Sequence, residues 1–370
     1  MAIEGVPEEM LAVQVVEFNQ PYKIHKVPTP TSLKPHEILL KTVVASLCHT
    51  DGMVVAGKFP TKLPCTASHE GTGIVVAVGD EVTEFKKGDR VMSGLPRNPC
   101  QQCFNCQGPK DWRQYCQKIE GYIGVFVDGA FSEYHIADAR TSCHIPEKVS
   151  FANAAPLACA GCTIYRAISV ADVPDGGWLG IVGAGGGLGH LGIQFAIAKG
   201  IYVVAIDARD EGLELCKKAG AQHIFDAREG KEKVVEKVQE LTGGLGVHAS
   251  INVSEHETSA DMACAITRMH GTMVQTAQPD RVSVAFQELI FRDIRIRGTL
   301  IASQEDSQEM LDNAGKYGIN VETNLFYGLE EVPKMVELAH SGTMKGKAVC
   351  VVDRAEFEKE NERLGASHTA

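Results

Sequence analysis

The sequence lacks three features that would assign it to large classes of protein. It has no run of eighteen apolar residues, which a membrane-spanning helix requires. Lys and Arg number 36 against 47 Asp and Glu, so the formal net charge of −11 argues against a nucleic-acid-binding face. The first eleven residues carry acidic side chains and no Lys or Arg, unlike a secretory signal or a transit peptide. We therefore expect a cytoplasmic protein that binds neither nucleic acid nor membranes.

Low-complexity tracts and internal repeats are also absent, and the composition is that of a globular protein with 44% hydrophobic and 22% charged residues. A length of 370 residues fits two domains better than one. The first 150 residues contain short extended runs separated by Gly, Pro and Asp, such as Glu37–Ala45, Gly73–Val78 and Arg90–Met92. This pattern predicts a β-rich domain with loops.

From about Trp178 onward, short apolar runs alternate with segments of helical length. Six strands of a doubly wound parallel sheet are predicted from this alternation. The expected strands are Trp178–Val182, Ile201–Ile206, His223–Phe225, Val247–Val253, Thr272–Thr276 and Ile294–Leu300. The expected helices are a segment ending near Lys199, Glu211–Ala219, Lys231–Leu241, Glu255–Met269 and Phe286–Arg292. A further helix is expected at Glu305–Tyr317, and the charged tail Arg354–Ala370 is expected to be partly disordered.

A glycine-rich loop follows the first of these strands and opens a helix. It comprises Gly183, Gly185, Gly186, Gly187, Leu188 and Gly189, a slightly longer variant of the dinucleotide fingerprint. Such glycines let backbone N–H groups approach a pyrophosphate at the helix N-terminus. Asp207 ends the second strand, where a carboxylate can accept a hydrogen bond from a ribose hydroxyl and repel a 2′-phosphate. NAD is therefore favoured, although Arg209 could contact the phosphate of NADP.

Twelve cysteines are many for a chain without a secretion signal, which favours metal ligands over disulfides. Four of them, Cys100, Cys103, Cys106 and Cys116, lie within seventeen residues. Four thiolates this close can surround a tetrahedral Zn²⁺ and leave no position for a substrate, which is typical of a structural zinc site. An iron–sulfur cluster is the alternative, but the spacing resembles that of ferredoxins only loosely. The others, Cys65, Cys143, Cys162, Cys216, Cys264 and Cys350, are expected to be small buried hydrophobic residues.

A second set of metal-type residues is spread along the chain. Cys48 begins the sequence Cys-His-Thr-Asp, His69 precedes Glu70, and Cys159 stands in Cys-Ala-Gly. Cys, His and Cys would provide three protein ligands and leave a fourth position open, as in a catalytic zinc site. Spacing alone does not establish this triad, because a single Cys or His is more often a core or surface residue.

Together these motifs resemble the zinc-dependent medium-chain alcohol dehydrogenases, in particular their tetrameric fungal and bacterial branch. The resemblance covers nearly the whole chain. It implies a β-rich GroES-like catalytic domain formed by residues 1–158 and 303–370, and a Rossmann domain formed by residues 159–302. It also implies NAD, two zinc ions per chain, an alcohol or aldehyde substrate, and assembly into a homo-oligomer.

The resemblance further implies roles for individual residues. Cys48, His69 and Cys159 would bind the catalytic zinc, with Glu70 behind it as a transient ligand. Thr50 would hydrogen-bond the alcohol oxygen and start a proton relay. Asp51 would orient His69. His49 and Lys347 match positions that contact the pyrophosphate, although an ordinary solvated lysine is the alternative for Lys347.

Three positions depart from the family pattern. Ser68 replaces a glycine before the His ligand, where a Cβ is strained if φ is positive. Met53 stands where many relatives have the histidine that ends the proton relay, and a thioether cannot accept that proton. Leu95 replaces an indole that narrows the pocket, while Phe59 keeps an aromatic wall. A pocket for primary alcohols bulkier than ethanol is therefore expected.

Other functions compete with this interpretation. A polyol or secondary-alcohol dehydrogenase of the same superfamily often lacks the second cysteine ligand or the cysteine lobe, and both are present here. A zinc-free reductase would lack all seven ligands. A non-catalytic zinc or NAD-binding protein would not need the complete set of neighbouring groups. An aldehyde reductase in a specialised biosynthetic pathway is compatible with the wider pocket.

Overall fold

The computed structural model describes residues 3–365, which form two compact units. The first contains the residues up to Cys159, Ala302–Gly318 and the residues from Thr323 onward, and the second contains Ala160–Ile301 and Ile319–Glu322. The boundaries expected from the sequence lie after residues 158 and 302, and Ile319–Glu322 was not expected to belong to the second unit. This short segment joins the second unit because the Gln194 side chain donates to the Asn320 carbonyl and accepts from the Asn320 N–H, both at 2.9 Å.

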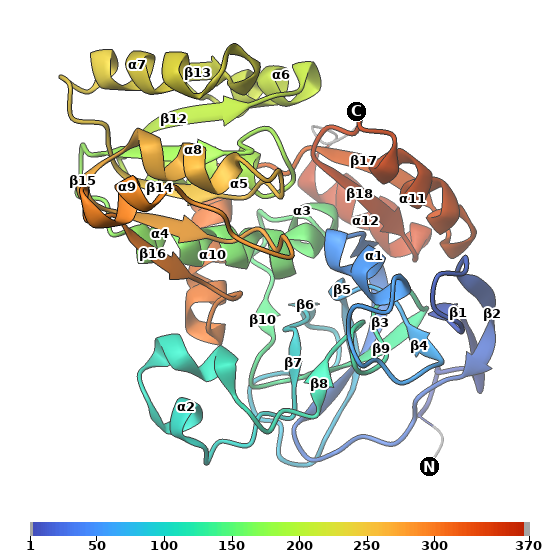
Figure 1. Ribbon diagram of the computed structural model, residues 1–370. Coiled ribbons are helices and arrows are strands. Elements are labelled where there is room, and N and C mark those ends of the chain that lie inside the picture. The colour runs from blue at the N-terminus through green and yellow to red at the C-terminus, as the bar shows by residue number, and fades with distance from the viewer. Residues whose placement is uncertain (1–2, 366–370) are drawn as a thin grey trace. The chain divides into compact units, whose positions relative to one another are not determined.

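The second unit is built on a six-stranded parallel sheet in the order β13-β12-β11-β14-β15-β16 (Figure 1). Its strands are β11 (Trp178–Val182), β12 (Tyr202–Asp207), β13 (His223–Asp226), β14 (Val247–Asn252), β15 (Thr267–Gln275) and β16 (Arg295–Gly298). Ile181 and Val182 are neighbours in the central strand and therefore point to opposite faces of the sheet, yet both are buried. Both faces are therefore covered, as a parallel sheet requires, and the predicted doubly wound sheet is confirmed.

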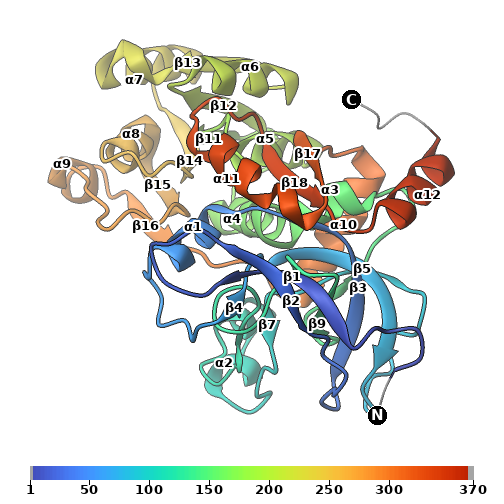
Figure 2. The ribbon, with the colours of Figure 1, turned by 90° about the vertical axis from the view of Figure 1, so that its right-hand side faces the viewer.

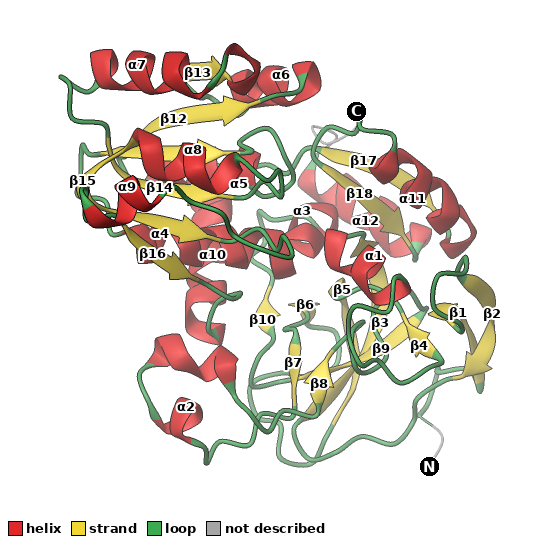
Figure 3. Ribbon diagram, viewed as in Figure 1, coloured by secondary structure: helices red, strands yellow, loops and turns green. Residues whose placement is uncertain are grey.

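Helices pack against both faces of this sheet (Figures 2 and 3). They are α4 (Cys162–Ala171), α5 (Gly189–Ala198), α6 (Asp210–Lys218), α7 (Lys231–Leu241) and α8 (Ser259–Ile266). The unit also contains the largely exposed α9 (Phe286–Ile290) and a short 3₁₀ turn, η3 (Ala227–Glu229). The helix predicted over Glu255–Met269 was too long at both ends, because α8 starts at Ser259 and residues from Thr267 onward belong to β15. Thr267 pairs with Val247 in the sheet, and its hydroxyl hydrogen-bonds the Ala263 carbonyl at 2.7 Å, which ends the helix.

The first unit is rich in β-structure, as predicted. Its main sheet has the order β10-β6-β5-β3-β18-β17, with β9 also paired to β3, beside a three-stranded sheet β2-β1-β4 and the pair β7-β8. Strands β1 and β2 lie side by side as a long antiparallel pair in Figure 2. The strands are β1 (Glu9–Val15), β2 (Lys23–Pro28), β3 (Glu37–Ser46), β4 (Cys65–Thr66), β5 (Glu70–Val78), β6 (Arg90–Met92), β7 (Pro96–Arg97), β8 (Gly121–Tyr122), β9 (Tyr134–Asp138), β10 (Cys143–His144), β17 (Thr323–Tyr327) and β18 (Lys347–Val351).

The helices of the first unit include one that corrects a prediction. They are α1 (His49–Val55), α2 (Phe104–Gln107), η1 (Lys110–Tyr115), α3 (Phe151–Pro156), α10 (Gln304–Tyr317), η4 (Leu329–Glu331), α11 (Val332–His340) and α12 (Arg354–Leu364). The start of the tail, which was expected to be partly disordered, is α12. Asp353 caps its N-terminus by accepting from two backbone N–H groups, and Phe357 and Glu360 are buried. Residues 366–370 of that tail lie outside the described residues.

One helical stretch, Phe151–Ala171, has the length and hydropathy of a membrane-spanning helix. It joins α3 and α4 through a π-helical turn, η2 (Leu157–Gly161). Of the most apolar part of this stretch, 78% is buried inside the protein. The core helix of a globular protein can have the same length and hydropathy, so this stretch is weak evidence for a membrane span.

Candidate functional site

The first candidate ligand, Cys48, stands between β3 and α1. It is the N-cap of α1, with an extended backbone, and its N–H donates to Asp51 Oδ2 at 2.8 Å. Asp51 is completely buried, and its other oxygen accepts the N–H of Ser68 at 2.9 Å. One carboxylate therefore joins the backbone at Cys48 to the backbone next to His69.

The second candidate ligand, His69, directly precedes β5. Its side chain is 1% exposed, yet neither ring nitrogen has a hydrogen-bond partner among residues 3–365. Asp51 Oδ1 lies 3.9 Å from His69 Nδ1, which is too far for a hydrogen bond. Asp51 thus holds the surrounding backbone and contacts the imidazole only through its charge. Buried polar atoms are nearly always satisfied, so the ring nitrogens require a partner such as a metal ion.

Cys159, the third candidate, lies in the π-helical turn η2 directly after α3. Such turns widen a helix locally and are frequent at functional sites. Pro156 at the end of α3 has no N–H to donate to the preceding turn, which favours the irregularity at this point. The local sequence therefore sets Cys159 apart from the regular helix on either side.

These elements bring Cys48, His69, Glu70 and Cys159 together, with one donor atom from each within 4.8 Å of all the others. Two sulfurs, a nitrogen and a carboxylate oxygen form a donor set that suits Zn²⁺. A hydrogen bond with Cys159 lowers the pKa of Cys48 well below its usual value, although burial opposes this. Burial would lower the pKa of His69, but the charges of Cys48 and Asp51 raise it to about 9, so a metal ion would compete with a proton there.

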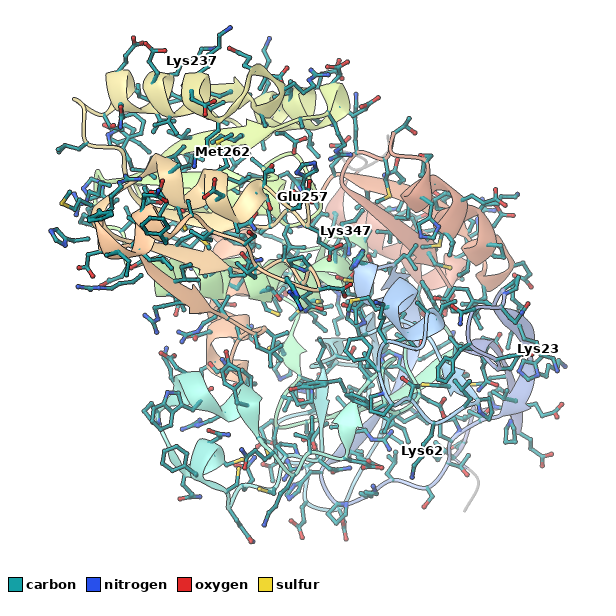
Figure 4. All side chains as sticks on the ribbon, in the orientation of Figure 1. Lys23, Lys62, Lys237, Glu257, Met262 and Lys347 are labelled. Carbon is teal, nitrogen blue, oxygen red and sulfur yellow. The ribbon has the colours of Figure 1, made fainter. Side chains whose placement is uncertain are left out.

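Lys347, labelled in Figure 4, is paired with Glu70. Its Nζ lies 2.9 Å from Glu70 Oε1 and 2.8 Å from Oε2. The lysine is 4% exposed, so it is not the ordinary solvated lysine of the alternative interpretation. Burial would lower the pKa of Lys347, but the carboxylate of Glu70 and the thiolate of Cys48 raise it above its usual value. The donor set therefore has a fixed positive charge behind Glu70.

Other predicted site residues lie in α1 or follow it in the chain. Thr50 Oγ1 lies 4.0 Å from Cys48 Sγ, His49 is exposed, and Met53 is half-buried. Phe59 packs edge-to-face on Phe126, with ring centroids 6.1 Å apart. Phe126 was not identified from the sequence, because it lies 67 positions further along the chain in a segment with no motif. Elsewhere in the unit, Leu95 is buried.

The cysteine lobe forms a separate cluster in the same unit. Neighbouring sulfurs lie 3.6 Å apart for Cys103–Cys106 and Cys100–Cys116, and 3.9 Å apart for Cys103–Cys116. Hydrogen bonds from the backbone N–H groups of Cys106 and Gln117 lower the pKa of Cys103 to about 6, whereas burial and the neighbouring sulfurs raise that of Cys106 to about 12. Four sulfurs this close could all be thiolates only with a cation between them, so the lobe also fits a metal ion.

The remaining cysteines behave as predicted. All are buried, and none belongs to either donor cluster. They are Cys65, Cys143, Cys162, Cys216, Cys264 and Cys350. The expectation that these six are small buried residues is thus confirmed.

In the second unit, the glycine-rich loop connects β11 to α5. Gly183 has a φ of +85°, and a Cβ on Gly185 would lie 2.1 Å from the Gly212 carbonyl oxygen. A Cβ on Gly189 would lie 2.5 Å from Ala184. These glycines are required by the close approach of backbone to backbone.

Asp207, at the end of β12, anchors this loop. It accepts hydrogen bonds from the N–H groups of Gly185, Ala208 and Arg209 at 2.9, 2.9 and 3.0 Å. The Arg209 guanidinium donates back to the Gly185 carbonyl at 3.2 Å. Sequence reasoning missed Gly212 in α6, where a Cβ would lie 2.3 Å from Asp207 Oδ1. No fingerprint includes this position, because only the packed structure brings it beside Asp207.

Comparison with known proteins identifies the family of the chain. Residues 34–147 match the family described as alcohol dehydrogenase GroES-like domain, and residues 187–316 match zinc-binding dehydrogenase. An alcohol dehydrogenase of Moraxella sp. strain TAE123 is 34% identical over 345 residues, which cover 92% of this chain and 98% of the relative. Alcohol dehydrogenase 1 of Emericella nidulans is 34% identical over 332 residues, covering 89% and 93%.

The fold comparison gives the same result. A solved alcohol dehydrogenase from the archaeon Aeropyrum pernix superimposes with a TM-score of 0.83 at 28% identity, covering 92% of this chain and 99% of that one. The chain belongs to the zinc-dependent medium-chain alcohol dehydrogenase family.

Proposed function

We propose that this member of the family transfers a hydride between NAD and a primary alcohol bulkier than ethanol, and that it serves as an aldehyde reductase in a specialised biosynthetic pathway. The observation that carries the proposal is the donor set of Cys48, His69, Glu70 and Cys159 within 4.8 Å, in which both nitrogens of a buried imidazole lack a hydrogen-bond partner among the described residues. Three such ligands and an open fourth position are typical of catalytic zinc.

In this proposal Cys48, His69 and Cys159 hold the catalytic zinc, and the four-cysteine lobe holds a second, structural zinc. When bound, the catalytic zinc supplies a Lewis acid that lowers the pKa of an alcohol oxygen. Glu70 lies close enough to act as a transient ligand, and its ion pair with Lys347 keeps the carboxylate available in a buried place. The hydride acceptor is the nicotinamide, so the redox chemistry belongs to the coenzyme.

The protein side chains then handle the proton and the coenzyme. Thr50, next to Cys48, is proposed to hydrogen-bond the alcohol oxygen and accept its proton. His49 and Lys347 are proposed to contact the pyrophosphate. Asp207 favours NAD over NADP because its carboxylate repels a 2′-phosphate. It already accepts three backbone N–H groups, and a carboxylate has about four acceptor sites, which leaves one for a ribose hydroxyl.

A direct assay tests the proposal. The purified protein is incubated with NADH or NADPH and a panel of aldehydes from acetaldehyde to hexanal and benzaldehyde, with and without prior chelation. We expect chelator-sensitive oxidation of NADH, and a higher kcat/KM for the larger aldehydes, because Leu95 leaves room that an indole would fill. A steep preference for acetaldehyde would contradict the wide pocket, and turnover that survives removal of all metal would contradict the zinc mechanism.

Substitution of Met53 by His tests how the proton leaves the site. A methionine cannot carry a proton at neutral pH, whereas an imidazole titrates near pH 6.5. We expect Met53→His to raise kcat for alcohol oxidation above about pH 7 and to add an ionisation near that value to the pH–rate profile. Met53→Leu is the control and should keep the wild-type profile. An unchanged profile in Met53→His would show that this position takes no part in proton transfer.

The second unit also supports the proposed homo-oligomer. Phe286, Ile290 and Phe291 in and beside α9 are 60, 71 and 69% exposed. They follow β15 in the chain and precede β16, which forms an open edge of the sheet. Large exposed apolar side chains beside an unpaired edge are typical of an interface. We expect the molecular mass in solution to be that of a tetramer, and we expect Ile290→Glu to have a lower mass. A monomeric wild type would contradict the proposal.

A further inference from the structure

Ser68, directly before His69, has an unusual backbone. Its φ is +70°, in the left-handed region that favours glycine, and its side chain is completely buried. A side chain is strained in this region because its Cβ approaches a carbonyl oxygen. Strain of this kind persists only where the surrounding structure holds the residue in place, and it gathers at functional sites.

The backbone around Ser68 shows how it is held. Its N–H donates to Asp51 at 2.9 Å, and its carbonyl accepts from the Ala130 N–H at 2.8 Å. Two glycines pack against it so closely that a Cβ on Gly129 would lie 2.1 Å from the Ser68 carbonyl oxygen, and one on Gly124 would lie 2.4 Å from its carbonyl carbon. The left-handed conformation is therefore imposed by the neighbours and does not depend on the side chain.

The hydroxyl of Ser68 makes two hydrogen bonds that a glycine could not make. It donates to the Ser46 carbonyl at 2.9 Å and accepts from the Glu70 N–H at 3.3 Å. Ser46 and Glu70 are the last paired residues of the β3–β5 ladder on this side. Beyond the end of the ladder, the hydroxyl thus links two segments by hydrogen bonds. One segment leads into Cys48, and the other contains His69.

We propose that Ser68 is a positioning residue for the metal site, and that its hydroxyl fixes the segment of Cys48 relative to that of His69 before a metal binds. The proposal rests on the proposed function, in which these two residues are zinc ligands. A glycine would adopt the same backbone without strain but could not join the two segments. The presence of the more strained residue is therefore explained by what its hydroxyl does.

Two substitutions of Ser68 separate the hydroxyl from the strain. Ser68→Ala removes the hydroxyl and keeps the strained Cβ, whereas Ser68→Gly removes both. The control is Ser142→Ala, because Ser142 is equally buried and its hydroxyl makes the same two kinds of hydrogen bond. It donates to the Asp138 carbonyl at 2.8 Å and accepts from the Gly94 N–H at 3.2 Å. Ser142 belongs to neither donor cluster.

The measurement is the release of Zn²⁺ from the loaded full-length protein to a coloured chelator, with the cobalt-substituted protein as a spectroscopic check. We expect both Ser68 variants to bind the metal of the His69 site about 10- to 100-fold more weakly, as is usual when a residue that orients ligands is lost. Release from the four-cysteine lobe should not change. Ser68→Gly should unfold at a higher temperature than Ser68→Ala, and Ser142→Ala should keep wild-type metal release at both sites.

Two results would overturn the proposal in distinguishable ways. In the first, His69→Ala contains less metal than the wild type, but Ser68→Gly retains metal as tightly as the wild type. The hydroxyl then does not position the ligands, and the proposed function stands. In the second, His69→Ala has the same metal content as the wild type. The His69 site then holds no metal, and the proposed function fails together with the role of Ser68.

Discussion

Replacement of Cys159 by Ala is expected to lower kcat/KM for aldehyde reduction by at least about 10³-fold, because a Lewis acid contributes several kcal/mol to transition-state stabilisation and each 1.36 kcal/mol is worth a factor of ten. The variant loses one of three proposed ligands, and alanine offers no donor. The zinc content should fall by one ion per chain, while the four-cysteine lobe keeps its own. Steady-state kinetics and metal analysis of the same sample check both expectations.

Cys162→Ala provides the matched control for this experiment. Cys162 is three residues further along the same helical stretch and is buried, but it belongs to neither donor cluster. The variant should keep its zinc and its kcat/KM. Equal losses of activity in the two variants would mean that Cys159 acts through packing of the helix, and that it is not a ligand.

Gly185→Ala is expected to raise KM for NADH by about 10- to 100-fold, since overpacking of this kind costs about 1–3 kcal/mol and must be relieved by moving the loop. The new Cβ would lie 2.1 to 2.3 Å from three backbone atoms of Gly212, and backbone cannot rotate away as a side chain can. Moving the loop would also disturb the hydrogen bond from the Gly185 N–H to the Asp207 carboxylate. Steady-state kinetics with varied NADH, together with binding followed by fluorescence, measures the effect.

The control for the loop is Gly298→Ala in β16. No atom lies within 4 Å of a Cβ built on Gly298, and its φ is not in the left-handed region. This variant should have the wild-type KM for NADH. If Gly185→Ala binds NADH as tightly as Gly298→Ala does, the loop tolerates the displacement, and its close packing on α6 is not needed for coenzyme binding.

The second unit was the part of the fold most accurately predicted from sequence. The boundaries of β11 and α7 were predicted to the residue, because apolar runs and helical periodicity there are flanked by glycines and aspartates. The helix end at Ile266 was missed, since pairing of Thr267 with β14 is a contact between strands that local periodicity does not contain. Helix α12 was missed because its charge suggested a solvated tail, while two side chains, Phe357 and Glu360, anchor it in the unit.

The composition of the metal clusters could be predicted, but not the way in which they are supported. Ligand types, together with the family resemblance, named all the residues that the structure brings together. The ion pair of Lys347 with Glu70 joins residues 277 positions apart, which no motif spans. Asp51 was expected to orient the imidazole of His69, whereas its carboxylate oxygens accept the N–H groups of Cys48 and Ser68. Such supporting contacts depend on tertiary structure.

The most direct test of the central claim is to remove all metal from the wild-type protein and return Zn²⁺ stepwise while following both bound zinc and NADH-dependent aldehyde reduction. The account predicts binding of about two zinc ions per chain and recovery of turnover only as the site of Cys48, His69 and Cys159 fills. In His69→Ala the same titration should end one ion lower, without turnover. Full turnover in the metal-free protein, or in His69→Ala, would contradict the account.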